Sequence, residues 1–190
     1  MKSVVVYCAA SAKIPQDFLE AGRQVGRLLA QRGYTVYTGG GRTGLMAAVI
    51  DGAVSQGGKA VGVLPSFMIR NGWNHPGLTE MVEVDGMHER KAEFLGKAEA
   101  VIALPGGTGT FDELFESITM RQLNLYHGRI VVMNYRGYYD PLIEQIRRAI
   151  DLQFMSPDHA ELFETASTPE ETVAKALTPD THGDFEQKIR

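Results

Sequence analysis

The stretch that decides the fold is Pro105-Gly106-Gly107-Thr108-Gly109-Thr110, which closes the apolar run 100–104 and is followed three positions later by Glu113. An apolar run of about five residues bounded by Pro-Gly predicts a buried strand. The residues that then recur at the spacing of one helix face are Phe111, Leu114, Phe115 and Ile118. We therefore expect a strand, a glycine turn and a helix in direct succession.

This turn has the chemistry of an anion cradle. Glycines let a ligand approach the backbone closely, and the free N–H groups and positive dipole end of a helix favour negative charge. Residues Gly106 to Thr110, namely Gly106, Gly107, Thr108, Gly109 and Thr110, would hold a phosphate. We expect Glu113 in the first turn of the helix, as a carboxylate beside the anion.

The same alternation of strands and helices extends outward over most of the chain. We expect strands at 4–8, 34–38, 60–64, 82–84, 100–104 and 130–134, helices at 15–32, 45–54, 88–98 and 141–154, a long loop at 65–79, and another helix after Thr168. Such alternation implies right-handed crossovers. The fold class is therefore α/β, a Rossmann-like doubly wound parallel sheet in a single domain over 1–178, with a polar tail at 179–190.

Composition and charge narrow the class of protein. A chain of 190 residues with 44% hydrophobic and 22% charged residues fits one globular domain. The formal net charge of −4 and pI near 5.7 argue against a general binder of nucleic acid or anionic membranes. The single cysteine, Cys8, fits a reducing compartment, and no apolar run approaches the roughly 20 residues of a membrane span. We expect a cytoplasmic protein without nucleic-acid or membrane partners.

The fold type predicts where distant segments meet. In a doubly wound sheet every helix begins at the edge where the strands end, and binding sites gather there. We therefore expect Ser11, the turn residues Gly40 and Gly41, and the start of the helix that carries Arg90 and Lys91 to converge with the cradle. Arg90 and Glu113 would then share one cleft.

Two simpler interpretations compete with this one. Thr110-x-x-Glu113 also has the spacing of a helix capping box, as does Thr168-x-x-Glu171, which lacks a glycine turn. For Thr168 and Glu171 we expect capping only. For Glu113 we favour function, because its position coincides with the cradle.

Other ligand classes find little support. Gly39-x-Gly41-x-x-Gly44 matches the dinucleotide spacing, but the next strand ends in Leu64-Pro65-Ser66 without an acidic residue. The histidines (75, 88, 127, 159 and 182) show no ligand spacing. We predict no NAD or other cofactor and no metal.

The combined motifs resemble those of the LONELY GUY (LOG) family of cytokinin riboside 5′-monophosphate phosphoribohydrolases, long labelled possible lysine decarboxylases. The resemblance rests on the glycine turn with Glu113, on Met87-His88-x-Arg90-Lys91, and on further stretches at 37–46, 118–123 and 137–139. It covers roughly residues 3 to 155.

The resemblance implies hydrolysis of the N-glycosidic bond of a purine nucleoside 5′-monophosphate, by a homodimer with its cleft near the interface. Arg90 and Glu113 match the catalytic pair of the family, while Lys91, the cradle residues and Thr119 match nucleotide contacts. Gly72 stands where family members usually have a glutamate, and Met120-Arg121 replaces the usual Trp-Ala. The base preference therefore stays open.

The residues also suggest a mechanism. We expect an ionised Glu113 to stabilise the positive charge that builds on the ribose, and to orient or deprotonate the attacking water. A helix N-terminus and Arg90 nearby would favour that charged form. The main rival is a non-enzymatic carrier or sensor of a nucleotide or phosphorylated cofactor. Amino-acid decarboxylation would need a pyridoxal lysine, and none is evident.

Overall fold

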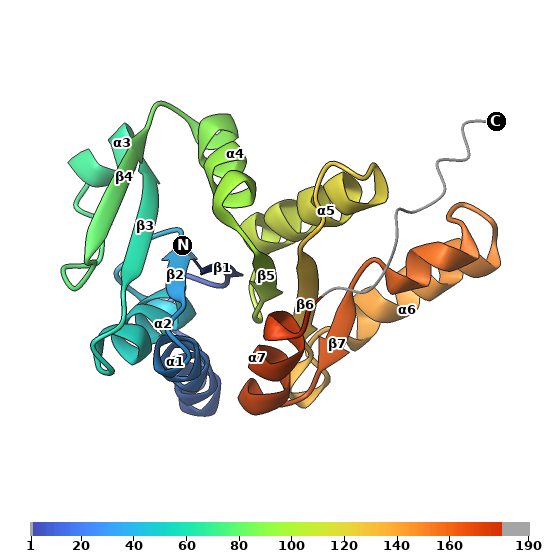
Figure 1. Cartoon of the computed structure of the whole chain (residues 1–190), viewed down its shortest axis with the longest axis horizontal. Coiled ribbons are helices and arrows are strands. Elements are labelled where there is room, and N and C mark those ends of the chain that lie inside the picture. The colour runs from blue at the N-terminus through green and yellow to red at the C-terminus, as the bar shows by residue number, and fades with distance from the viewer. Residues whose placement is uncertain (1, 180–190) are drawn as a thin grey trace.

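The computed structural model describes residues 2–179. They form an α/β fold in which helices cover both faces of a parallel sheet (Figure 1). The strands are β1 (Ser3–Tyr7), β2 (Thr35–Thr38), β3 (Ala60–Pro65), β4 (Glu80–Val84), β5 (Ala100–Ala103), β6 (Arg129–Met133) and β7 (Glu164–Ala166). The α-helices are α1 (Gln16–Gln31), α2 (Gly44–Val54), α3 (Ser66–Arg70), α4 (Met87–Lys97), α5 (Thr108–Gln122), α6 (Asp140–Asp151) and α7 (Pro169–Leu177). The predicted Rossmann-like class is confirmed.

The strand order is β4-β3-β2-β1-β5-β6-β7, and every pairing is parallel. The order reverses between β1 and β5, and ligands bind at such a switch point in open α/β sheets. The two chain segments that leave the sheet there run side by side. The N–H of Leu104 donates to the carbonyl of Tyr7 at 2.9 Å, and the N–H of Ala9 donates to Pro105 at 3.2 Å. The glycine turn therefore starts at the switch point.

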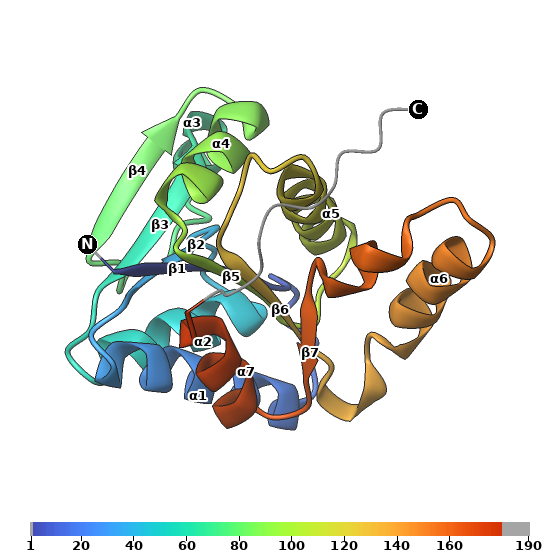
Figure 2. The same ribbon diagram turned by 45° about the vertical axis from the view of Figure 1, so that its right-hand side comes forward.

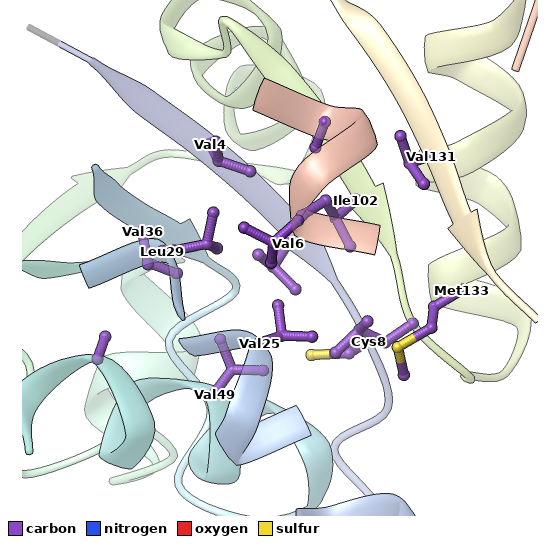
Figure 3. Close-up of a cluster of buried hydrophobic side chains, with 14 of the residues drawn as sticks. Val4, Val6, Cys8, Val25, Leu29, Val36, Val49, Ile102, Val131 and Met133 are labelled. Carbon is purple, nitrogen blue, oxygen red and sulfur yellow. The ribbon is translucent and has the colours of Figure 1, made fainter. Parts of the chain in front are cut away.

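Alternating residues of the central strand divide the core into two layers. Val4 and Val6 point into a cluster beneath α1, α2 and α7, which Figure 3 shows with Val25 and Leu29 of α1. Val5 and Tyr7 point to the other face, where α4 and α5 pack. Figure 2 shows these two groups of helices on opposite sides of the sheet. Side chains alternate between the two faces of any strand, and the unbroken run of buried residues in β1 is typical of a strand covered on both faces.

The sequence-based prediction was wrong in several elements. The expected loop at 65–79 contains α3, a five-residue helix with no buried residue, so it carries no apolar stripe that periodicity could detect. Strand β7 was missed because it is three residues long, Glu-Thr-Ala, and lies at the sheet edge. Short 3₁₀ helices at Tyr135–Gly137 and Pro157–Glu161 were also missed.

The C-terminal prediction has two outcomes. Thr168 caps α7, because its hydroxyl accepts the N–H of Glu171 at 3.2 Å, and the Glu171 carboxylate accepts the N–H of Ser167 at 2.8 Å. The capping prediction is confirmed there. Of the predicted tail at 179–190, all but Pro179 lies outside the described residues.

Candidate active site

A guanidinium and a carboxylate meet beside the switch point. Arg90 lies in the first turn of α4, where its Nε donates to the carbonyl of Val63 at 3.0 Å and its guanidinium lies over the Phe94 ring at 5.4 Å. Its Nη1 is 3.9 Å from Oε1 of Glu113, and the two side chains are only 7% and 11% exposed. The structure therefore brings together the two residues expected to share a cleft.

Gly39, directly after β2, makes room for this guanidinium. A Cβ atom at Gly39 would lie 2.0 Å from Nη2 of Arg90 and 3.0 Å from Cε of Met46. Any side chain at this position would therefore displace the guanidinium. The sequence marked a glycine triplet here but did not show which member faces Arg90.

The protonation of Glu113 differs from the expectation. Burial raises the pKa of Glu113 to about 7, while Arg90 and Lys91 oppose that rise and Asp112 and Glu116 add to it. Arg90 favours the charged form of Glu113, as predicted, but the expected net preference for that form is wrong, because desolvation by burial is the larger cause and raises the pKa. Glu113 is also in the second turn of α5, not the first, since α5 begins at Thr108. Burial also disfavours the charged form of Arg90 and lowers its pKa, whereas the nearby Glu113 opposes this decrease.

Helix α5 does not use Thr110 and Glu113 as a capping box. Its N-cap is Gly107, which has no side chain to donate or accept, and Thr110 is buried inside the first turn. A Cβ at Gly106 would lie 2.1 Å from Oγ1 of Thr110, so glycine is required for this close packing. The competing structural explanation of Glu113 is therefore wrong.

The glycine turn borders a hollow that we call the turn pocket, with a volume of about 380 Å³. It is lined by Ala9, Ser11, Lys13, Ile14, Pro15, Phe18, Leu45, Pro105, Gly106, Gly107 and Tyr138. The Tyr138 hydroxyl donates to the carbonyl of Gly106 at 2.7 Å and thereby fixes the turn. Thr108 and Gly109 follow as exposed residues at the start of α5.

A second hollow, the tryptophan pocket, has a volume of about 480 Å³. It is lined by Ala10, Gly39, Gly41, Arg42, Thr43, Met46, Leu64, Met68, Trp73 and Arg90. The loop after β1 separates the two pockets, since Ala9 and Ser11 line the turn pocket and Ala10 lines the tryptophan pocket. One ligand could therefore present an anionic end and a flat apolar end to the two sides of this loop.

The segment that carries Trp73 is tied to the glycine turn after β2. The N–H of Arg42 donates to the Trp73 carbonyl at 3.0 Å, and the N–H of His75 donates to Gly40 at 2.8 Å. His75 Nε2 also lies 3.3 Å from a carboxylate oxygen of Asp51 on α2. Gly40 itself is buried with φ +69°, which is why the turn needs glycine. These bonds hold the half-exposed Trp73 ring at the pocket.

Gly72, where the family resemblance led us to expect a glutamate, has φ +66°. Glycine adopts this left-handed conformation without strain, whereas a glutamate would be strained. The turn before Trp73 is therefore shaped by the glycine, and the indole of Trp73 is the large side chain that this segment presents to the pocket.

Two expected nucleotide contacts lie outside the lining of both pockets. The Lys91 ammonium is 3.2 Å from a carboxylate oxygen of Asp112 and 2.9 Å from Glu116. Thr119 is exposed on α5, and its hydroxyl donates to the carbonyl of Phe115 at 2.8 Å. Thr119 is eleven positions after Thr108 in the sequence, or about 16 Å along the helix. Neither residue lines the turn pocket or the tryptophan pocket.

Sequence reasoning missed several residues that shape the pockets, namely Lys13, Met46, Met68 and Tyr138. Tyr138 belongs to a stretch that carried the family resemblance, which was a usable signal. Met46 belongs to another such stretch, at 37–46, whereas Met68 carried no signal, because methionine usually fills gaps in a core.

Within residues 2–179, no group of three or more His, Cys, Asp or Glu side chains is arranged to hold a metal ion. Over the same range, no helix combines the length and apolar character needed to cross a bilayer.

The fold and the site define an α/β protein of Rossmann-like topology with a charged pair at its switch point. Residues 46–176 match the model of the family described as possible lysine decarboxylase. The chain is 38% identical to cytokinin riboside 5′-monophosphate phosphoribohydrolase LOG of Oryza sativa subsp. japonica, over 92% of this chain and 72% of the relative. It is 37% identical to the phosphoribohydrolase LOG7 of Arabidopsis thaliana, over 90% and 79% of the two chains. The chain belongs to the LOG family.

Among solved structures, the molybdenum cofactor carrier protein of Chlamydomonas reinhardtii has a similar fold. The TM-score is 0.71 with 19% sequence identity, over 91% of this chain and 94% of the carrier. At this identity the likeness concerns the fold alone.

Proposed function

We propose that the protein hydrolyses the N-glycosidic bond of a purine nucleoside 5′-monophosphate, including N6-modified adenosine 5′-monophosphate, to the free base and ribose 5-phosphate. The observation that carries the proposal is the pairing of buried Arg90 with buried Glu113 at 3.9 Å beside the switch point. The phosphoribohydrolase names of the relatives support the reaction type.

In this reaction the bond between C1′ and the base nitrogen breaks, and its electron pair leaves with the base. Positive charge builds on the ribose, and the ionised Glu113 stabilises it. Water then adds its oxygen to C1′ and gives a proton to Glu113, while the departing base takes up a proton from solvent. A carboxylate with a pKa of about 7 is a stronger base than an ordinary glutamate, which favours this proton transfer near neutral pH.

The two pockets suggest how the nucleotide is oriented. We place the 5′-phosphate on the N–H groups at the start of α5, with Ser11 and Gly107 at the wall of the turn pocket. We place the base in the tryptophan pocket, where Trp73, Met46 and Met68 offer a flat, apolar lining. The ribose then lies beside Arg90, which also lines that pocket. Fixing phosphate and base on opposite sides of the ribose orients C1′ for reaction.

The rival functions explain less of the site. A carrier, the alternative suggested by the shared fold of the cofactor carrier, has no need to bury a carboxylate beside its anionic ligand, because that carboxylate repels it. A decarboxylase would need a lysine free to form a Schiff base. In this site the ammonium of Lys91 is paired with two carboxylates.

We also propose that the protein is a homodimer that packs through α5. Phe115, Thr119 and Leu123 follow one another at four-residue spacing on an exposed stripe, and Phe115 and Leu123 are both 44% exposed. Thr119, the nucleotide contact implied by the family, is on this stripe and about 16 Å from the cradle of its own subunit. A second copy on the stripe places Thr119 at the interface.

The test is release of free base from AMP and from isopentenyladenosine monophosphate, measured by chromatography. Wild-type protein should release base and the Glu113→Gln variant should not, with a loss of about 10²–10³-fold or more. Binding of ribose 5-phosphate should survive the substitution. Base release retained in Glu113→Gln, or no base release by the wild-type protein, would refute the proposal.

A further inference from the structure

Lys91 lies at the centre of an ion-pair cluster that joins α4 to α5. Its ammonium contacts Asp112 and Glu116, residues that flank Glu113 on α5, at 3.2 and 2.9 Å. The preceding residue on α4, Arg90, faces Glu113 itself at 3.9 Å. Two consecutive cations of one helix therefore meet three carboxylates of the other.

The environment of Lys91 argues against a free phosphate ligand. Its side chain is 15% exposed, and its ammonium donates to Oδ1 of Asp112 at 3.3 Å besides its contact with Glu116. A phosphate that approached it would meet the negative charge of two carboxylates. The Glu116 carboxylate is 31% exposed and that of Asp112 is 57% exposed, so the pair with Glu116 is the better shielded of the two and the firmer link between the helices.

We propose that Lys91 is a positioning residue: held between Asp112 and Glu116, its ammonium fixes α5 against α4 so that Glu113 lies beside Arg90. This proposal rests on the proposed hydrolysis, because it assigns Lys91 a role in that same site. It differs from the family expectation of a nucleotide contact, since Lys91 acts here through Glu113.

The charges that face Glu113 give this role a measurable signature. From α4 they are Arg90 and Lys91, and from α5 they are Asp112 and Glu116; the titratable but neutral side chains nearby are Tyr7 at the end of β1 and Cys8 directly after it. Lys91 opposes the rise in the pKa of Glu113, whereas Asp112 and Glu116 increase it. Removing the ammonium leaves two uncompensated carboxylates beside Glu113, so its pKa should rise further.

The experiment compares Lys91→Met, which removes the charge, with Lys91→Arg, which keeps it. For Lys91→Met we expect kcat to fall at least tenfold, the acid limb of the pH profile to move upward, and the Kd of ribose 5-phosphate to change less than threefold. Lys91→Arg should restore most of kcat. A Kd raised tenfold or more with kcat unchanged would show a phosphate ligand and overturn the proposal.

Two further variants sharpen the result. Lys97→Met is the matched control, because Lys97 is on the same helix and pairs with Glu93 at 3.8 Å within α4. It should leave kcat and the pH profile unchanged, and an equal effect of Lys97→Met would overturn the specific role of Lys91. Lys91→Met combined with Glu116→Gln should be no worse than Lys91→Met alone, since both remove the same ion pair. Full additivity would contradict the proposal.

A readout without turnover separates this proposal from the proposed function. The titration of the Glu113 carboxyl, followed by NMR with labelled glutamate, should move to higher pH in Lys91→Met and stay at its wild-type position in Lys97→Met. If the wild-type protein released no base, the hydrolysis would fail while this titration still tested the placement of Lys91. An unchanged Glu113 titration in Lys91→Met would overturn the proposal in either case.

Discussion

The guanidinium of Arg90 lies where a side chain at Gly39 would begin: a Cβ there would be 2.0 Å from Nη2. The two residues are 51 positions apart in the sequence, yet the end of β2 and the first turn of α4 meet at this point. The guanidinium of Arg90 can therefore occupy this position only because residue 39 is glycine and has no Cβ.

Gly39→Ala should impair the reaction without unfolding the protein. The clashing atom is the far end of a flexible side chain, so Arg90 moves away while the backbone stays. We expect the free energy of unfolding to change by less than about 2 kcal/mol, with kcat falling at least tenfold because Arg90 no longer faces Glu113. Denaturant unfolding and base-release assays measure the two effects.

Gly96→Ala is the control for this variant. Gly96 lies on α4 with no atom within 4 Å of the added Cβ, and alanine stabilises a helix by about 0.5–1 kcal/mol relative to glycine. Activity should stay at the wild-type level. Full activity of Gly39→Ala would mean that the observed position of Arg90 is not needed for turnover.

Activity should depend on pH through the Glu113 carboxyl. The ionised form stabilises the ribose cation, and burial raises the pKa of Glu113 to about 7. On the acid side, kcat/KM should therefore rise with pH and become constant above about pH 7. A pH series with AMP measures this limb. A limb near the ordinary glutamate pKa of 4.5 would contradict the assignment.

The same carboxyl should influence stability. The folded-state pKa of Glu113, about 7, lies above the ordinary value of 4.5, so the folded protein binds the proton more tightly than the unfolded chain does. This contribution to stability is complete below pH 4.5 and declines as the pH rises to about 7. Glu113→Gln removes that decline, so its stability relative to wild type should be greater at pH 8 than at pH 5, by at most a few kcal/mol. Urea unfolding at both pH values tests it, and an equal difference at the two values would contradict the raised pKa.

The alternation of apolar strands with helical spacing was enough to predict the parallel sheet, because both signals arise within short windows of the sequence. The strand that ends at 104 and the helix that contains Glu113 were found this way. Helix α3 and strand β7 were missed because one has no buried residue and the other has three residues at an edge. Their formation depends on neighbours that no local window contains.

The site was predictable where topology alone brings residues together. Arg90 and Glu113 meet because helix starts converge at one sheet edge, and the glycine turn marks that edge. The protonation of Glu113 was not predictable, because desolvation depends on how far tertiary packing buries its side chain, which is only 11% exposed. The ion pairs of Lys91 could not be predicted from the sequence either, because the order of charged residues does not show which carboxylates the lysine contacts.

Trp73→Ala should weaken the binding of the base. The indole lines the tryptophan pocket and is 50% exposed, so a base stacked on it covers apolar surface. We expect a loss of about 1–2 kcal/mol, or roughly tenfold in KM, since base–aromatic stacking is worth about 1–3 kcal/mol. The loss should be larger for a nucleotide with an apolar N6 substituent than for AMP.

The control for Trp73 is Phe154→Ala, an aromatic residue 82% exposed and outside the lining of both pockets. Its KM should match that of the wild-type protein. An unchanged KM in Trp73→Ala for both nucleotides would move the base out of the tryptophan pocket.

Leu123→Glu should dissociate the proposed homodimer. Leu123 shares the exposed stripe of α5 with Phe115, and a charge buried between two copies of this stripe would cost at least about 2 kcal/mol. Sedimentation velocity should show a species near twice 20.9 kDa for the wild-type protein and near 20.9 kDa for the variant. Leu152→Glu changes a leucine that is 57% exposed beyond the end of α6 and should remain dimeric. A dimer that persists in Leu123→Glu would place the interface on another surface. A monomeric wild-type protein would contradict the proposed role of Thr119, because this residue is about 16 Å from the cradle of its own chain.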